Sequence, residues 1–331
     1  MTTASIIVPA YNAAEVLPKC LRALAPSVGA TTDLVVVDDG STDGSAAAAE
    51  APDVQVLRRP ASDGPAAARN HGVRHTKGEV LLFVDADVEV APGAVARALE
   101  TLAARPDLAG VFGSYDDHPS APGLVSQFRN LLHHYVHQHG AADAFTFWAG
   151  FGALRREAFV SAGGFDERGA VNAIEDVDLG YRLRAAGFRL RLDRDMLCTH
   201  HKRWTLASML RADVLSRAVP WSRLVLRTGV APPDLNLAGS QRWSVALTGI
   251  LVATLPLLAW PAARAIAAAA AIGVVALNWR FYAFLRRARG TAFAVASVPL
   301  HLLHFMCGGL GFLWAWGESL LPRRTTRDAV A

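Results

Sequence analysis

Carboxylates follow apolar runs at two places in the chain, where they are positioned to bind a cation or a nucleotide. Asp38 and Asp39 follow one run, and Asp85 and Asp87 follow another. Residues i and i+2 of an extended segment point the same way, so Asp85 and Asp87 can reach one divalent cation, and Glu89 continues the alternation. Oxygen ligands favour Mg²⁺ or Mn²⁺ over zinc. A single carboxylate would be enough to cap a helix, so the adjacent carboxylates Asp38 and Asp39 indicate a binding role.

Further polar groups stand at the ends of strands or the starts of helices. Asn12 follows the first apolar run. Gly64 opens an Ala-rich segment whose N-terminal amides, together with Arg69, could face a diphosphate. Glu175 and Asp176 begin another helical segment. Acidic residues at a helix start can simply complement the helix dipole, which would explain one of these carboxylates but not the whole set.

The elements that must position these side chains form an alternating pattern between residues 5 and 112. The expected strands are SIIVP, LVVVD, VQVLR and VLLFVD, each followed by a turn and a helical stretch. Such alternation predicts a mostly parallel, Rossmann-like sheet covered by helices on both faces. Ligands of open α/β sheets bind beyond the carboxyl ends of the strands. The polar groups lie at those ends, so we expect them to converge.

The apolar residues concentrate near the C-terminus. The chain of 331 residues is 52% hydrophobic, with a mean hydropathy of +0.24. Charges are regular up to about residue 240, and the stretches 243–263, 265–279 and 291–317 carry none. A membrane span needs about 20 apolar residues, so we expect about three transmembrane helices, the second only if it extends through residue 284. The alternative is a set of buried helices in a soluble core.

The arginines suggest an orientation for these helices. Four arginines between the second and third stretches predict a cytoplasmic loop; they are Arg280, Arg286, Arg287 and Arg289. Three crossings would then place the basic tail, with Arg323, Arg324 and Arg327, on the opposite side, against the same rule. Either the rule is weakly violated, or one stretch is re-entrant and the number of crossings is even.

A basic, partly apolar segment precedes the first stretch. Residues 205–229 mix arginines with leucines, which predicts one or two interfacial helices, and we expect Pro220 to break them into two. An ordinary packed helix with a solvated face is the alternative. We therefore divide the chain into a catalytic domain (1–204), interfacial helices (205–241), transmembrane helices (242–321) and a polar tail (322–331).

Charge and cysteine content exclude other classes. The formal charge is +4 and the pI about 9.2, and no basic patch predicts a nucleic-acid partner. Three cysteines far apart have no metal-ligand spacing, which favours a reducing compartment. The N-terminus lacks the pattern of a secretory signal, so we expect the catalytic domain to lie in the cytoplasm, at the inner (plasma) membrane.

The motifs resemble those of family 2 glycosyltransferases of the GT-A fold. They occur in the same order and spacing, and the resemblance covers roughly residues 5–204. The motifs are SIIVPAYN, VVVDDGSTDGS, GPAAARN, FVDADV, GGFDE and EDVDLGYRLRAAG. The resemblance implies an α/β GT-A catalytic domain, followed here by an α-helical transmembrane region.

The resemblance also implies roles for individual residues. Asp176 would be the general base, and Glu175 would orient it or the acceptor. Asp85 and Asp87 would hold Mg²⁺ or Mn²⁺, with Glu89 or His200 as a further candidate ligand. The donor-binding candidates are Pro9, Tyr11, Asn12, Asp38, Asp39, Arg69, Asp85 and Arg203. His200, Arg203 and Trp204 match positions of the Gln-X-X-Arg-Trp motif of processive synthases, with His in place of Gln, and Trp204 and His201 are expected on the acceptor side.

The expected activity is inverting transfer of a sugar from a UDP- or GDP-type donor to a lipid-borne acceptor, such as a polyprenyl phosphate, at the cytoplasmic membrane face. The cation and Arg69 or Arg203 would stabilise the leaving diphosphate. A processive polysaccharide synthase and an inert nucleotide- or carbohydrate-binding membrane protein are the alternatives. A homo-oligomer is compatible with either enzyme.

Overall fold

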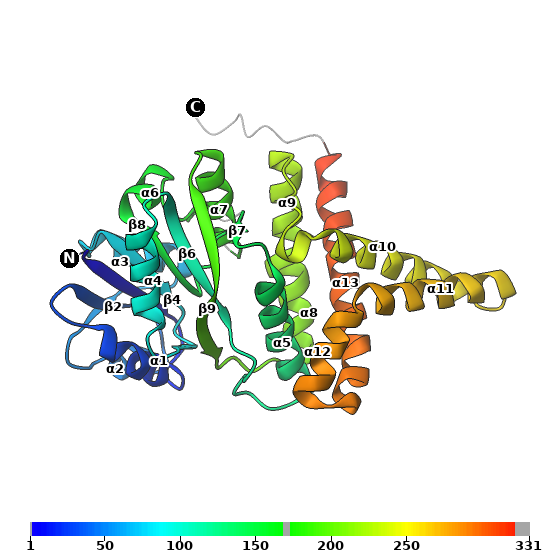
Figure 1. Cartoon of the computed structure of the whole chain (residues 1–331), viewed down its shortest axis with the longest axis horizontal. Coiled ribbons are helices and arrows are strands. Elements are labelled where there is room, and N and C mark those ends of the chain that lie inside the picture. The colour runs from blue at the N-terminus through cyan, green and yellow to red at the C-terminus, as the bar shows by residue number, and fades with distance from the viewer. Residues whose placement is uncertain (1, 168–172, 322–331) are drawn as a thin grey trace.

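The computed structural model describes residues 2–167 and 173–321. Figure 1 shows an α/β part that contains the N-terminal two thirds of the chain, with a group of C-terminal helices beside it. The strands are β1 Ala4–Ala10, β2 Thr32–Asp38, β3 Val54–Arg58, β4 Val80–Val84, β5 Val88–Val90, β6 Leu108–Tyr115, β7 Asp143–Ala144, β8 Phe151–Arg155 and β9 Arg189–His200.

The helices of the α/β part are α1 Leu17–Leu24, α2 Ser45–Ala48, α3 Pro65–Arg74, α4 Ala94–Ala104, α5 Leu124–His139, α6 Arg156–Ser161 and α7 Glu175–Ala185. The C-terminal helices are α8 Leu206–Arg211, α9 Val219–Thr228, α10 Gly239–Thr254, α11 Pro261–Leu277, α12 Trp279–Arg289 and α13 Thr291–Ser319. A π-helical segment, Ala212–Ala218, joins α8 to α9.

The described residues form one sheet with the strand order β3-β2-β1-β4-β8-β6-β9-β5, and β7 pairs with β9. The first four strands of this order are parallel, as the alternating pattern predicts. Strand β8 runs antiparallel to both β4 and β6. The four predicted strands are therefore confirmed, whereas β8, β5 and the long β9 lie in less regular sequence that gave no strand prediction.

Helices cover both faces of the sheet. In β1, Ile6 and Val8 pack in a core that includes residues of α1 and α4. Ile7, on the opposite face, packs in a second core that includes residues of α3, α6 and α7. Each residue in the centre of β1 is thus fully buried, which explains why this strand is a continuous apolar run.

The interfacial segment differs from its prediction at Pro220. Residues 206–228 are helical throughout, and Pro220 falls in the first turn of α9. The backbone changes from π-helical to α-helical hydrogen bonding just before the proline, and the fixed φ of proline is compatible with a helix. The expected break is therefore wrong. The preceding π-helical turn lets α8 and α9 follow each other directly.

The apolar stretches form α10 to α13. Among the residues described, α13 is long and apolar enough to cross a membrane by itself, and α11 with α12 meets the same requirement as a pair bent by 64°. Helix α10 has 16 residues, fewer than the 20 or so that a span needs. The expected three crossings stay a prediction, and the tail 322–331 lies outside the described residues.

Candidate active site

A cleft of about 550 Å³ opens at the carboxyl ends of β1, β2 and β4. Nine of the residues selected from the sequence line it: Pro9, Tyr11, Asn12, Asp39, Arg69, Asp85, Asp87, Glu175 and Asp176. They come from five separate segments of the chain. The convergence follows from the sheet, because β1 pairs with both β2 and β4 in parallel and the three strands end side by side.

Arg69 is the buried centre of this cleft. Its Nη1 donates to Glu175 Oε1 at 2.5 Å, and its Nη2 donates to Asp85 Oδ1 at 2.6 Å. The side chain is only 4% exposed, and its Nε is buried without a hydrogen-bond partner. The guanidinium thus joins α3 to α7 and to the loop after β4. Its charge is largely neutralised by the protein's own carboxylates, a use that the sequence did not indicate.

Glu175 and Asp176 begin α7, where the helix dipole favours negative charge. Asp176 accepts hydrogen bonds from the backbone N–H groups of Ala149 at 3.1 Å and Val177 at 2.8 Å, which fixes its carboxylate. Burial raises the pKa of Glu175 to about 7, against the opposing charge of Arg69. Burial also raises the pKa of Asp176 above its ordinary value. A carboxylate with a raised pKa is a stronger base when ionised, which suits proton abstraction.

Asp85 and Asp87 are both partly exposed to the cleft and alternate with buried Ala86. Asp87 Oδ2 lies 3.4 Å from His200 Nε2, and the other ring nitrogen of His200 lies 2.7 Å from Asn130 Oδ1. Burial raises the pKa of Asp87, but His200 outweighs this effect and the pKa is lowered overall. Asp87 is therefore held as an anion.

The donor set suits a cation that is shared with a phosphorylated ligand. No group of three or more His, Cys, Asp or Glu side chains with metal-binding geometry occurs among the residues that the structure describes. Mg²⁺ is commonly held by one or two carboxylates while substrate phosphates and water complete its shell. Asp85 and Asp87 fit that arrangement and would not form a closed metal site alone.

Asp39 and Asn12 shape the opposite wall. The Asp39 carboxylate accepts from Arg59, from Ser62 Oγ at 2.8 Å and from the Gly64 N–H at 3.0 Å. Asn12 has a left-handed backbone, with φ of 48°, and its side-chain oxygen accepts from the Thr42 N–H at 2.9 Å. Both residues hold loops of the cleft in place.

Several predicted residues do not line the cleft. Asp38 is buried and accepts from the Ser41 N–H, and Glu89 pairs with His201 at 2.7 Å. His200 stacks on Tyr115 behind Asp87. These four were expected to contact donor, metal or acceptor; they do not line the cleft, and their side chains contact protein groups, so their expected roles stay predictions.

The run His200–Trp204 also differs from expectation. Trp204 is 9% exposed and packs with Phe128 and Met209, away from the cleft. Arg203 is exposed and is not a lining residue. Lys202 lines the cleft instead, together with Ser216 from the π-helical segment. Residues 200–203 are four consecutive cationic or imidazole side chains. The path of the chain after β9 decides which of them enters the cleft.

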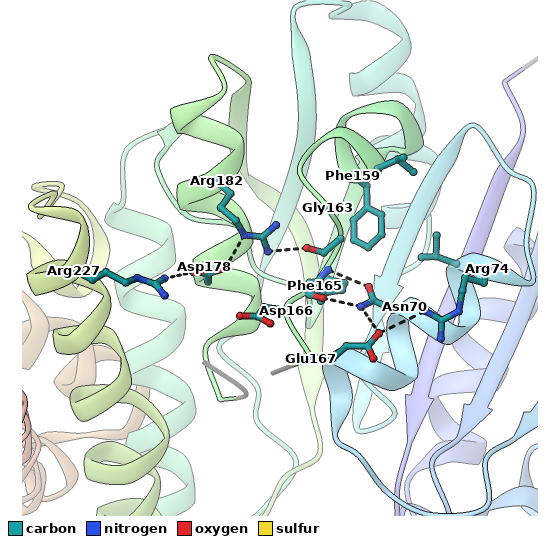
Figure 2. A pocket seen from close by; sticks show the side chains of 13 residues that line it. Asn70, Arg74, Phe159, Gly163, Phe165, Asp166, Glu167, Asp178, Arg182 and Arg227 are labelled. Atoms are coloured by element: carbon teal, nitrogen blue, oxygen red, sulfur yellow. Dashed lines mark hydrogen bonds and ion pairs between the residues drawn. The ribbon is translucent and has the colours of Figure 1, made fainter. Parts of the chain in front are cut away.

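A second hollow lies on the other side of α7, and Figure 2 shows its polar groups. Asp178 accepts from Arg182 Nε at 2.7 Å and from Arg227 Nη2 of α9 at 2.9 Å. Arg182 also donates to the carbonyls of Ala162 and Gly164. The dashed lines in Figure 2 trace this chain from α9 through α7 to the GGFDE segment. Asp178 is therefore structural.

The mixed sheet, with an acidic cleft at the carboxyl ends of its parallel strands, forms a Rossmann-like α/β domain. Residues 5–161 match the family described as Glycosyl transferase family 2. The chain therefore contains a glycosyltransferase family 2 domain, which is an enzyme domain.

Several bacterial glycosyltransferases match part of the chain, and two are described here in turn. An uncharacterized glycosyltransferase of Escherichia coli K12, YibD, is 35% identical over 31% of this chain and 31% of its own length. The undecaprenyl-phosphate 4-deoxy-4-formamido-L-arabinose transferase of Sodalis glossinidius is 35% identical over 32% of this chain and 35% of its own length. This chain thus spans about a third of the length of each.

A mannosyltransferase is among the solved structures that are similar over almost the whole chain. It is the mannosyltransferase PcManGT from Pyrobaculum calidifontis, solved in complex with GDP-Man and Mn²⁺. The TM-score is 0.61 at 21% sequence identity, and the match covers 95% of this chain and 87% of that chain. The similarity is therefore one of fold, and it extends beyond the α/β part into the C-terminal helices.

Proposed function

We propose that this chain is a metal-dependent, inverting glycosyltransferase that moves a sugar from a nucleotide-sugar donor to a lipid-borne acceptor. One observation carries the proposal: the carboxylate pair Asp85 and Asp87 and the half-buried acid Asp176 line the same cleft. A cation site and a base are the two groups that such a transfer requires.

The proposed mechanism assigns one task to each side of the cleft. Asp85 and Asp87 would hold Mg²⁺ or Mn²⁺, and the bound ion would supply positive charge to stabilise the departing diphosphate. Asp176 accepts the proton of the acceptor hydroxyl. The acceptor oxygen forms a bond to the anomeric carbon, and the bond between that carbon and the diphosphate oxygen breaks. Attack from the side opposite the leaving group inverts the configuration, and the nucleoside diphosphate leaves with the electron pair.

Arg69 serves this mechanism as a positioning residue. It holds Glu175 beside Asp176 and holds Asp85 at the cation site. Lys202, which is exposed at the cleft, provides a cation on the diphosphate side. We assign to Lys202 the electrostatic role that the sequence suggested for Arg203.

A lipid acceptor is supported by the apolar C-terminal helices and by the name of the Sodalis relative, which acts on undecaprenyl phosphate. A UDP- or GDP-type donor is supported by PcManGT, which was solved with GDP-Man. A phosphate acceptor needs little base catalysis because it is already ionised, whereas a hydroxyl acceptor depends fully on Asp176.

Donor hydrolysis tests the proposal without knowledge of the acceptor. The purified full chain in detergent is incubated with a panel of UDP- and GDP-sugars and Mn²⁺, and nucleoside diphosphate release is measured. We expect slow release from one donor, abolished by EDTA. A panel of membrane lipids, read by mass spectrometry, then identifies the acceptor. No release from any donor, with or without lipids, would favour a nucleotide-binding module instead.

A further inference from the structure

Helices α10 and α11 form an antiparallel hairpin that projects away from the rest of the molecule (Figure 1). Large apolar side chains cover its outer surface. They include Ile250, Val252, Leu255, Leu257, Ile266 and Ile272, each more than 40% exposed. A soluble protein would not leave such a continuous apolar surface in contact with water.

The hairpin differs from a helix pair of a soluble protein in where its large apolar side chains lie, because they face outward. The side chains between its helices are small or carry hydroxyl groups: Ser244, Thr248 and Thr254 from α10, and Ala263, Ala267, Ala270 and Val274 from α11. Gly273 approaches Leu247 so closely that a Cβ there would lie 2.9 Å from the leucine Cδ1. Small residues inside and large apolar residues outside are typical of helices surrounded by lipid.

Tryptophans mark both ends of the hairpin. Asn278 Nδ2 donates to Ser244 Oγ at 2.8 Å, so the adjacent Trp243 and Trp279 lie level at the base. Trp260 lies at the tip, 66% exposed. Helix α11, which runs from the tip to the base, has 17 residues and so rises about 25 Å. Hydrocarbon is about 30 Å thick and tryptophan concentrates at its two boundaries, so this spacing fits a full crossing.

Charge is distributed as the two boundaries require. Arg242 and Arg280 flank the hairpin at its base, and three more arginines follow in α12. Arg264, one turn from the tip, is the single charged residue of the hairpin between residues 243 and 279, and it is exposed. A long side chain at that depth can extend to the far boundary. The base therefore carries the excess of positive charge expected for the cytoplasmic side.

Helix α13 satisfies the length requirement, but one of its faces is covered by protein, and 33% of its most apolar window is buried. It packs on α5, α9, α10, α12 and the π-helical segment, and Leu300 and Phe305 are buried, whereas Leu313 and Trp314 are exposed. His304 of α13 lies 3.0 Å from Asp213, which is itself paired with Arg129 of α5. Helix α11 bends by 64° from α12, which packs along α13, so the hairpin and α13 cannot both run along the membrane normal.

We propose that the α10–α11 hairpin crosses the bilayer twice, and that α13 lies on the same side as the α/β domain. The partner is the hydrocarbon of a lipid bilayer, contacted around the whole hairpin. Two crossings return the chain to its starting side, so the end of α13 faces the compartment of the active site. This inference does not depend on the enzymatic activity.

Cysteine labelling of the full chain in sealed proteoliposomes tests the topology. The native cysteines, Cys20, Cys198 and Cys307, are all buried, so new exposed cysteines report independently. Ala259→Cys lies at the hairpin tip, Ser319→Cys at the end of α13, and Glu50→Cys on the α/β domain. We expect an impermeant maleimide to label Ser319→Cys from the same side as Glu50→Cys, and Ala259→Cys from the opposite side. Ala259→Cys labelled from neither side, or Ser319→Cys labelled from the far side, would overturn the proposal.

A charge substitution provides a second measurement that does not need a cysteine. Ile272, 68% exposed on α11, and Val160, 63% exposed on α6, are similar apolar surface residues. We expect Ile272→Asp to reduce the membrane-inserted fraction severalfold, because hydrocarbon strongly disfavours a carboxylate within a span. Val160→Asp should fractionate like wild type. Equal fractionation of the two variants would contradict insertion of the hairpin.

Discussion

The guanidinium of Arg69 donates to the carboxylate of Glu175 at 2.5 Å across 106 positions of sequence. This contact joins α3 to α7, the helix that carries the proposed base. Both side chains are almost fully buried, so the Arg69 cation compensates the charge of Glu175 and also pairs with Asp85. The carboxylates of the proposed site are therefore held in place by a protein cation.

Arg69→Met should destabilise the chain by about 3 kcal/mol, because it leaves two carboxylates near the cleft without their buried cation. Thermal unfolding in detergent should show a fall in Tm of roughly 6–12 °C. Arg58→Met removes the exposed pair of Arg58 with Glu50 and serves as the control, with an expected change below about 1 kcal/mol. Equal changes in Tm would mean that the buried pair contributes no more than a surface pair.

Asp176→Asn should retain nucleoside diphosphate binding and lose transfer to a hydroxyl acceptor by about 10²- to 10⁴-fold. The amide keeps the shape of the side chain and removes its basicity. Binding by calorimetry and transfer by mass spectrometry separate the two effects. Asp143→Asn, at an exposed pair with Arg184, is the matched control. Transfer near the wild-type rate would disprove the assignment of Asp176 as the base.

Glu175→Gln should become more stable relative to wild type as pH rises from about 4.5 to about 7. Because burial raises the pKa of Glu175, the folded state holds this proton at pH values where the unfolded state has released it. Stability contributed by the neutral acid is thus present at low pH and is lost as pH rises through the folded pKa.

Denaturant unfolding of both proteins at several pH values measures this difference. Glu157→Gln, at an exposed glutamate of α6, controls for the general effect of the substitution. A Glu175→Gln difference that is constant with pH, or that changes in the opposite direction, would contradict a raised pKa.

Asp87→Ala should weaken Mn²⁺-dependent binding of nucleoside diphosphate by at least tenfold, because Asp85 alone would remain to hold the cation. Calorimetric titration with and without Mn²⁺ gives the metal-dependent part. Glu89→Ala is the matched control two residues further along, since Glu89 is paired with His201 outside the cleft. A weaker effect for Asp87→Ala than for Glu89→Ala would show that Glu89, and not Asp87, contributes to the cation site.

The sequence was sufficient to predict the parallel part of the sheet and the position of the cleft. Continuous apolar runs identify β1, β2 and β4 because these strands are buried on both faces, and carboxylates at their ends must then meet. Such local patterns indicate whether a segment is a strand or a helix and which face of it each residue occupies. They do not indicate which distant residue a side chain contacts, which is why the contacts of Arg69 could not be predicted.

The acceptor side was harder to predict for a related reason. Trp204 and Arg203 were chosen by motif position, but the chain leaves β9 so that Lys202 enters the cleft and Trp204 enters the helical core. Composition likewise marked α13 as apolar without showing that it packs on α5. Direction after a strand end and packing between distant helices depend on tertiary contacts, and no local pattern encodes them.

The shared carboxylate of Asp178 has a mechanical consequence. Asp178 and the proposed base Asp176 lie on the same helix, and Arg227 of α9 forms an ion pair with Asp178. The helix that carries the base therefore cannot tilt without pulling on α9, and α9 in turn packs along α13. If the hairpin is inserted in a bilayer, these contacts fix the distance between Asp176 and the lipid surface. That distance would then limit which acceptor headgroups can reach the proposed base.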